Sequence, residues 1–228
     1  MIKVAKITEQ DRKVFAEIEY VRMSIIRADL ELKYFDYGAG DPEDCRTEEE
    51  MLNGIEVVSS TSRVCAIGLK SEWAEYMYSL IKAYKPKKVL ELGTCCGFSS
   101  IYMSKASPKS EIHTLDGAEA VSEIAGQNMQ VLGCENITRH VGRFADILDD
   151  VLSQLKSIDF IFIDGHHDKD ATINYFNKVK DFCSSGGIIV FDGISWSKSM
   201  REAWEIIISD DSIAYSKDKT KLGVVVMK

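Results

Sequence analysis

One short segment of this chain has the pattern of a buried strand that runs through a glycine turn into a helix. Residues 89–100 read VLELGTCCGFSS. Apolar residues surround Glu91, the glycines Gly93 and Gly97 bracket the turn, and helical spacing begins at Phe98. A strand that ends in a carboxylate and a glycine turn suits a nucleotide-like ligand with an amino group, since that group needs a negative partner. The segment therefore indicates the ligand-binding unit of an α/β domain.

Strand and helix patterns alternate from about residue 86 to the end of the sequence. We predict five strands, at residues 89–92, 111–115, 136–141, 159–163 and 188–191. The helices between and after them are predicted at residues 98–105, 118–132, 146–155, 170–182 and 200–208. Residues 213–216 and 222–227 can close the sheet as an antiparallel hairpin. Such alternation is typical of a doubly wound α/β fold, so we expect a mostly parallel, seven-stranded, Rossmann-like sheet.

The first 70 residues have a different pattern, which is helical and irregular. Thr8-Glu-Gln-Asp11 has the residues of a capping box, and apolar spacing predicts a helix over about 9–32. Gly and Pro residues predict a loop over 36–42, and Ser71 can cap a helix over 71–84. We expect residues 1–70 to be a helical and loop extension that forms a lid, a substrate pocket or a dimer contact. Residues 71–228 are then the ligand-binding domain.

Composition limits the classes of function. The 228 residues carry a net charge of −8, which argues against a general binder of nucleic-acid phosphates. The longest apolar runs are too short to span a bilayer, and the first 20 residues lack an apolar signal-peptide core. The six cysteines include no CxxC pair, so zinc spacing is absent and reduced thiols are expected. We expect a cytoplasmic protein that binds neither nucleic acid nor membrane.

Ligands of doubly wound sheets bind outside the carboxyl ends of the strands, and this rule selects the residues to inspect. Glu91 offers a negative partner for an amino group, and the backbone donors of the turn, with Ser99, can hold a carboxylate. The alternative is an ordinary strand–turn–helix that Glu91 caps. Asp116 ends the next strand, where an acid can accept both hydroxyls of a ribose or cap the following helix.

Two further carboxylates and two histidines follow later strands of the predicted sheet. Asp164 and Asp192 end the fourth and fifth strands and can share a divalent ion through oxygen ligands, or act as helix caps. His166 and His167 follow Asp164, and a neutral imidazole can serve as a general base near pH 7. The other two histidines lie inside predicted strands and are expected to be core or surface residues: His113 and His140.

Taken together, the segment from about residue 86 to residue 228 resembles a class I S-adenosylmethionine-dependent methyltransferase. Within that class it is similar to the catechol O-methyltransferase-like enzymes and to bacterial small-molecule O-methyltransferases. Residues 91–99 resemble the first motif, Asp116 the ribose-binding acid, and residues 142–146 the segment that flanks the adenine. Asp164 and Asp192 resemble the two metal ligands of the metal-dependent members. His167 falls where those enzymes place a catalytic lysine.

The resemblance implies methyl transfer from S-adenosylmethionine to a hydroxyl of a small molecule, by a homodimer. The implied catalytic residues are His167, as the base, and Asp164. Tyr34, Tyr37 and Trp196 can supply apolar walls of the substrate pocket, or they are ordinary packing residues. The implied cofactor site comprises twelve residues: Glu91, Gly93, Thr94, Gly97, Ser99, Asp116, Gly117, Gly142, Arg143, Phe144, Asp164 and His166.

One position departs from the family pattern and leaves the metal open. The metal-dependent relatives follow the second aspartate with Asn or Asp, whereas this chain has Gly193 after Asp192. A Mg²⁺ ion at Asp164 and Asp192 would lose one protein ligand, although water or a substrate oxygen can fill that place. A histidine at the position of the lysine fits a base that acts without metal equally well.

Three other functions stay open at this point. A nicotinamide-dependent oxidoreductase has a similar sheet but needs a phosphate-binding turn, and the G-x-G-x-x-G pattern is absent from residues 91–99. A metal-dependent hydrolase would use His166, His167, Asp168 and Asp192. A binding module would hold the cofactor without turnover.

Overall fold

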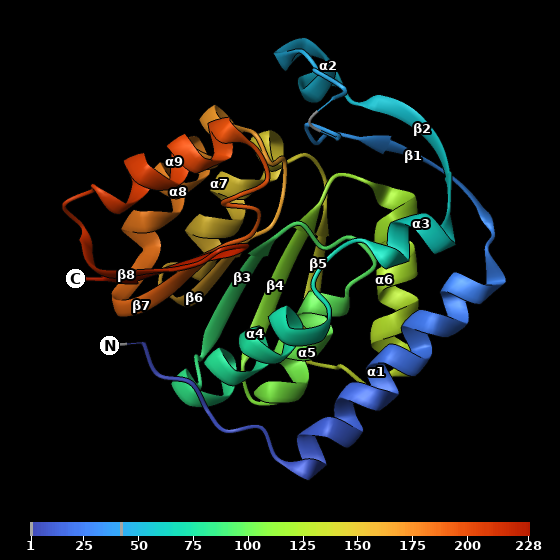
Figure 1. Ribbon diagram of the computed structural model, residues 1–228, viewed down its shortest axis with the longest axis horizontal. Coiled ribbons are helices and arrows are strands. Elements are labelled where there is room, and N and C mark those ends of the chain that lie inside the picture. The colour runs from blue at the N-terminus through green and yellow to red at the C-terminus, as the bar shows by residue number, and fades with distance from the viewer. Residues whose placement is uncertain (1, 42) are drawn as a thin grey trace.

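A seven-stranded sheet forms the centre of the protein, which a computed structural model describes over residues 2–41 and 43–228. The strand order is β5-β4-β3-β6-β7-β9-β8 (Figure 1). Strands β3 to β7 pair in parallel, and β9 runs antiparallel to β7 and β8. The bounds are β3 Lys88–Leu92, β4 Glu111–Asp116, β5 Ile137–Val141, β6 Ile158–Ile163, β7 Cys183–Phe191, β8 Ile213–Lys219 and β9 Leu222–Met227. The predicted doubly wound sheet and its closing hairpin are confirmed.

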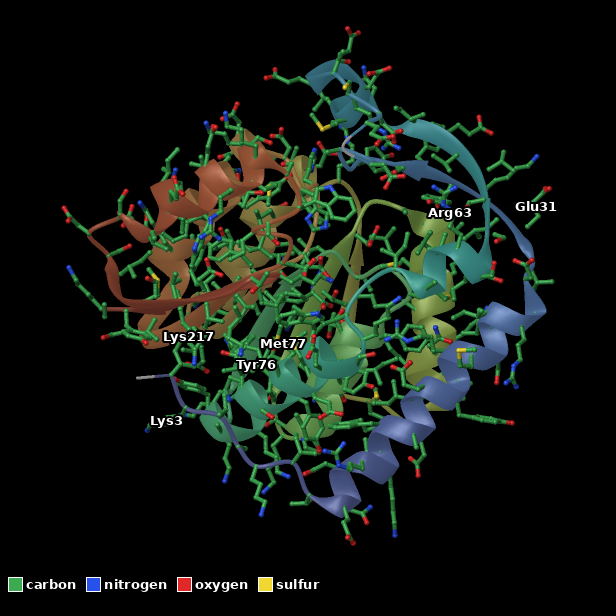
Figure 2. All side chains as sticks on the ribbon, viewed as in Figure 1. Lys3, Glu31, Arg63, Tyr76, Met77 and Lys217 are labelled. Atoms are coloured by element: carbon green, nitrogen blue, oxygen red, sulfur yellow. The ribbon has the colours of Figure 1, made fainter. Side chains whose placement is uncertain are left out.

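Helices cover both faces of this sheet, because its central strands are apolar on both sides. Side chains such as Val89 and Phe162 pack under α4 (Ser71–Tyr84), α5 (Phe98–Ala106) and α6 (Glu119–Val131). Leu90 and Ile161 point to the other face, under α7 (Phe144–Leu155), α8 (Lys169–Val179) and α9 (Lys198–Ile208). A short 3₁₀ turn, η1 (Lys180–Phe182), follows α8. Figure 2 shows the side chains that fill the space between these layers.

The first 70 residues contain two strands that the sequence analysis did not predict. Helix α1 spans Glu9–Ala28 and ends at Asp29, whose φ of 45° is left-handed. Strand β1 (Glu31–Asp36) then pairs antiparallel with β2 (Ile55–Ser60). The prediction of helix over 31–32 and of loop at Asp36 is therefore wrong: β1 alternates exposed and half-buried residues with the period of a strand. Pro42, in the predicted loop, lies outside the described residues.

Two short helices accompany this hairpin. Helix α2 (Glu48–Asn53) lies between its strands, and α3 (Thr61–Ala66) follows β2 (Figure 1). Ser71 does not cap α4 as predicted; Lys70 holds the cap position, and Ser71 is the first helical residue. The described residues before α4 thus form strands as well as helices.

Helix α1 packs on α3 and α5 and is fixed at its start by the predicted capping box. The Thr8 hydroxyl accepts a hydrogen bond from the Asp11 amide, and the Asp11 carboxylate accepts one from the Thr8 amide. The same carboxylate accepts hydrogen bonds from the Tyr78 hydroxyl and the Lys82 ammonium of α4. The buried Asp11 side chain therefore both caps α1 and joins it to α4.

A buried arginine holds α1 against the loop that follows α3. Arg22 is 2% exposed and donates hydrogen bonds to the carbonyl oxygens of Cys65 and Leu69. Its guanidinium lies 4.1 Å from the centre of the Phe98 ring, at the start of α5. One side chain thereby joins α1, α3 and α5.

We expect Arg22→Met to lower the free energy of unfolding by about 3 kcal/mol, because two buried carbonyl oxygens lose their donors while the apolar volume is kept. Urea unfolding followed by circular dichroism measures the change. Arg12→Met, on an exposed arginine of the same helix, is the matched control and should stay within about 0.5 kcal/mol of the wild type. Equal losses in the two variants would contradict the role given to Arg22.

No helix in the described part of the chain combines the length and the apolar character needed to cross a membrane.

Candidate active site

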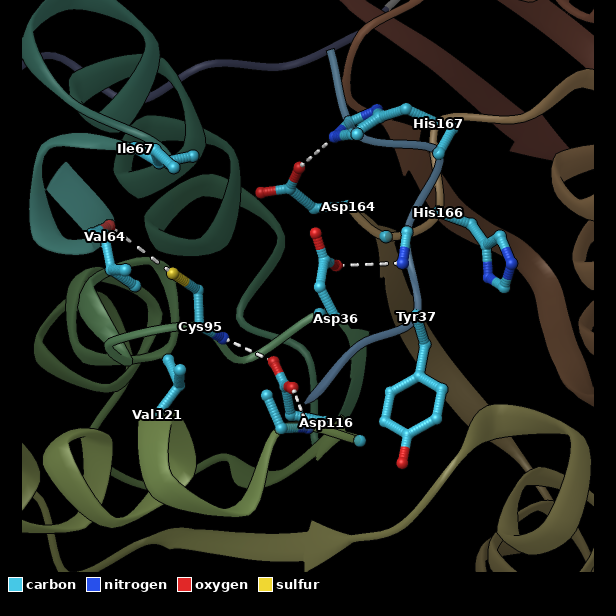
Figure 3. A pocket seen from close by; sticks show the side chains of 18 of the residues that line it. Asp36, Tyr37, Val64, Ile67, Cys95, Asp116, Val121, Asp164, His166 and His167 are labelled. Atoms are coloured by element: carbon cyan, nitrogen blue, oxygen red, sulfur yellow. Dashed lines mark hydrogen bonds and ion pairs between the residues drawn. The ribbon is translucent and has the colours of Figure 1, made fainter. Parts of the chain in front are cut away.

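A cavity of about 510 Å³ opens at the carboxyl ends of the parallel strands, beneath the β1–β2 hairpin. Figure 3 shows Asp116 from β4, Asp164 from the end of β6 and Asp36 from β1 facing one another across it. Strand β3 lies between β4 and β6, so the chain winds away from β3 in both directions. This is the crevice in which doubly wound sheets bind their ligands.

Glycine lets the ends of β3 and β6 meet at the floor of the cavity. The Asp164 amide donates to the carbonyl oxygen of Leu92, and Gly93 has a φ of 105°. A Cβ on Gly93 would lie 2.0 Å from the carbonyl oxygen of Asp164, so no side chain fits there. The close approach places the first glycine turn directly beside Asp164.

Asp116 is anchored by backbone donors and faces the cavity. One carboxylate oxygen accepts a hydrogen bond from the amide of Cys95, in the glycine turn, and the other from the amide of Ala118. Burial raises the pKa of Asp116 above its usual value. Each oxygen keeps a lone pair for a ligand, so Asp116 can accept two further hydroxyl protons.

Glu91 lies below the cavity floor and is not among the described residues that line it. Its side chain is fully buried and accepts hydrogen bonds from the Ser100 and Thr114 hydroxyls. Burial raises the pKa of Glu91 to about 7. Glu91 supports the turn from beneath, and its Oε1 has no hydrogen-bond partner among the described residues. The expected contact between Glu91 and an amino group stays a prediction.

A cluster of charged side chains lies on the β6–β7 side of the cavity. Asp164, His167 and Asp192 offer ligand atoms that all lie within 4.8 Å of one another. His167 Nε2 is 3.5 Å from Asp164 Oδ1, and Lys221 Nζ is 3.3 Å from Asp192 Oδ1. Burial, then the nearby charge of Asp192, raises the pKa of Asp164, whereas burial lowers the pKa of His167.

Gly193 makes room for the ring of His167. A Cβ on Gly193 would lie 2.7 Å from His167 Nδ1, and the φ of Gly193 is 69°. The opposite side of the ring faces Trp196, whose ring centre is 5.9 Å away. An Asn or Asp at position 193 would collide with this histidine, so the two departures from the family pattern fit one another.

Aromatic rings form the wall next to His166. The Tyr175 hydroxyl lies 2.8 Å from His166 Nδ1, and the Tyr175 ring contacts Phe144 edge to face. Tyr37 packs on Gly117, where a Cβ would lie 2.6 Å from the Tyr37 ring. Tyr37 therefore lies beside Asp116, on the side opposite the charged cluster (Figure 3).

Two polar contacts bind the segment between β1 and β2 to the domain, and a third lies within that segment. The amide of Ala39 donates to the carbonyl oxygen of His166. Arg143 donates to the carbonyl oxygen of Leu52 in α2. Within the hairpin, Arg46 pairs with Asp36 at 2.8 Å. The segment between β1 and β2 thus covers the carboxyl ends of the sheet.

Comparison with known proteins identifies a family that this part of the chain matches. Residues 90–194 match the family profile described as "Methyltransferase domain". This part of the chain, which carries the glycine turn, Asp116 and Asp164, is a methyltransferase domain. The resemblance seen in the sequence is thereby confirmed.

The curated relatives of this chain include plant and bacterial enzymes. Caffeoyl-CoA O-methyltransferase 1 of Zea mays is 25% identical over 72% of this chain and 63% of its own length. Catechol O-methyltransferase of Mycobacterium tuberculosis is 26% identical over 76% of each chain. The chain thus spans less than two thirds of the maize relative.

Solved structures share the fold of this chain. An O-methyltransferase from Bacillus cereus, in complex with S-adenosylhomocysteine, has a TM-score of 0.63 at 17% identity, over 95% of this chain and 91% of that chain. A putative O-methyltransferase from Klebsiella pneumoniae has a TM-score of 0.62 at 20% identity, over 72% and 83%.

The fold brings most of the predicted site residues to one cavity. Those that line it are Tyr34, Tyr37, Gly93, Thr94, Ser99, Asp116, Gly117, Arg143, Phe144, Asp164, His166, His167, Asp192 and Trp196. Three predicted residues do not line it: Glu91, Gly97 and Gly142. His113 and His140 lie outside it as expected, stacked on each other at the β4–β5 edge. Sequence reasoning missed Asp36, Cys95, Tyr175 and Lys221, which also line the cavity.

Proposed function

We propose that this protein transfers the methyl group of S-adenosylmethionine to a hydroxyl oxygen of a small molecule. The observation that carries the proposal is that a hydrogen-bond acceptor for a ribose and a candidate base face the same cavity. Asp116 offers free acceptors beside the glycine turn, and the Asp164–His167–Asp192 cluster offers a base opposite. The relatives named above as O-methyltransferases support the transfer to oxygen.

The cofactor would be held between the glycine turn and the aromatic wall. Asp116 would accept the ribose hydroxyls, since both its oxygens are already oriented by backbone amides. Tyr37 and Phe144 line the same cavity and would contact the nucleoside. Thr94 and Ser99 line the turn where the amino-acid end would lie. Bound there, S-adenosylmethionine supplies an electrophilic methyl group.

His167 is the residue that would take the acceptor's proton. Burial lowers its pKa, which keeps the imidazole neutral at pH 7. Nε2 lies 3.5 Å from Asp164, at the outer limit of a hydrogen bond, so it stays open to accept a proton. The carboxylates of Asp164 and Asp192 would then stabilise the imidazolium. Most of the rate enhancement would come from orientation of the two substrates.

The acceptor would enter beneath the hairpin, against Tyr34 and Trp196. Both side chains line the cavity, and Trp196 contacts the His167 ring. An apolar wall beside a base suits a flat hydroxylated compound. The homodimer and the cytoplasmic location remain predictions from the sequence, and analytical ultracentrifugation tests the first of them.

We expect the purified protein to convert S-adenosylmethionine to S-adenosylhomocysteine only when a suitable hydroxylated compound is present. A panel of hydroxylated small molecules, with methyl-labelled donor and mass spectrometry of both products, measures this. Equal amounts of S-adenosylhomocysteine and methylated compound are the expected result. Calorimetric titration with nicotinamide dinucleotides is the control. Binding of those dinucleotides, with none of S-adenosylhomocysteine, would favour the oxidoreductase instead.

A further inference from the structure

A lysine occupies the charged cluster at a place where the fold family leads one to expect a metal ion. Lys221 precedes β9, which runs antiparallel to β7 with Phe191 opposite Gly223. This register brings Lys221 beside the residues that follow β7, and the amide of Ile194 donates to its carbonyl oxygen. The backbone therefore fixes Lys221 next to Asp192.

The side chain of Lys221 continues into the cluster. Its ammonium lies 3.3 Å from Asp192 Oδ1, and Lys221 lines the same cavity as Asp164 and His167. Asp192 is 6% exposed, and its Oδ1 has no hydrogen-bond partner among the described residues. The ammonium is thus the cation that this buried oxygen faces.

The residues present fit an ammonium better than a divalent ion. Gly193 supplies no ligand atom, and the space at that position is filled by the His167 ring. A divalent ion bound to Asp164 and Asp192 would lie against the Lys221 ammonium, and like charges at such distances repel strongly. Two buried carboxylates need a positive partner, and Lys221 already provides one.

We propose that Lys221 is the resident cation of the Asp164–Asp192 pair, so that this protein works without a divalent metal. Lys221 is a positioning residue: it neutralises Asp192 and holds the pair in place beside His167. The inference deepens the proposed function and rests on it for the assignment of the site. The binding of metal is measurable whether or not methyl transfer is found.

Manganese binding tests the proposal directly. Mn²⁺ titration followed by electron paramagnetic resonance should show no saturable site in the wild type up to 1 mM, a concentration on the order of weak protein sites for divalent cations. Lys221→Gln removes the charge and keeps the length, and it should bind Mn²⁺ at least about 10-fold more tightly. Lys217→Gln, on an exposed lysine of β8 (Figure 2), is the matched control and should behave as the wild type.

Several results would overturn the proposal. Tight Mn²⁺ binding by the wild type would do so, and so would equal affinity in the wild type and Lys221→Gln. If Lys221→Gln does not fold, the wild-type titration alone decides. Where methyl transfer is measurable, chelation should leave the wild-type rate unchanged, and Lys221→Arg, which keeps the charge, should retain more activity than Lys221→Gln. Binding of S-adenosylhomocysteine, measured separately by calorimetry, tests the proposed function, so the two failures are distinguishable.

Discussion

Asp116→Ala is expected to weaken the binding of S-adenosylhomocysteine by about 100-fold, measured by isothermal titration calorimetry. The Asp116 carboxylate would accept two ribose hydroxyls, and hydrogen bonds to a charged group contribute about 1.5 kcal/mol or more each. A loss of about 3 kcal/mol corresponds to roughly two orders of magnitude in affinity. The variant also removes the acceptor for the Cys95 and Ala118 amides, so the glycine turn loses an anchor.

Two further variants separate these contributions. Asp116→Asn keeps an acceptor oxygen without the charge and should bind S-adenosylhomocysteine with intermediate affinity. Glu119→Ala, on an exposed acid three residues away in the first turn of α6, controls for the loss of negative charge and should bind as the wild type. Unchanged affinity in Asp116→Ala would remove the ribose assignment.

The sheet was predictable because each of its signals is local. The apolar runs of β6 and β7 are buried on both faces, and their length and spacing in the sequence identify them as central parallel strands. Once the sheet is doubly wound, the carboxyl-end rule collects Asp116, Asp164 and Asp192 at one edge without any knowledge of distances.

The β1–β2 hairpin was not predictable in the same way. Its two strands have half-buried and exposed residues, such as Phe35 and Val58, and no core of their own. A two-stranded hairpin of this kind is stable only through contacts with the domain, here through Ala39 and Arg143. Those contacts join residues far apart in the sequence, and no local pattern reports them.

The positions of Glu91 and Lys221 depend on features of the sheet that strand ends alone do not report. Glu91 precedes the last residue of β3, and side chains alternate along a strand, so it points under α5 to Ser100 rather than into the cavity. Lys221 directly precedes β9, the antiparallel strand beside β7, and an antiparallel strand begins at the carboxyl end of its neighbour. A prediction that paired β9 with β7 would have placed Lys221 at the cavity.

His167→Gln is expected to lower the rate of methyl transfer by about 10²- to 10³-fold, the contribution typical of a general base. Glutamine fills a similar space between Gly193 and Trp196 but cannot take up the proton of the acceptor. Affinity for S-adenosylhomocysteine should stay within about 2-fold of the wild type, because Asp116 lies on the opposite side of the cavity. Single-turnover rates with a saturating acceptor measure the loss.

The pH profile distinguishes a base from a merely structural histidine. The neutral imidazole is the active form, so the wild-type rate should rise with pH through the pKa of His167. Burial lowers that pKa, which places the rise on the acidic side of the usual histidine value near 6.5 and leaves a plateau at neutral pH. His167→Gln should lack this limb, whereas His140→Gln, at the β4–β5 edge, should keep both the rate and the limb. A wild-type rate in His167→Gln, or an unchanged acidic limb, would eliminate His167 as the base and move the search to Asp164.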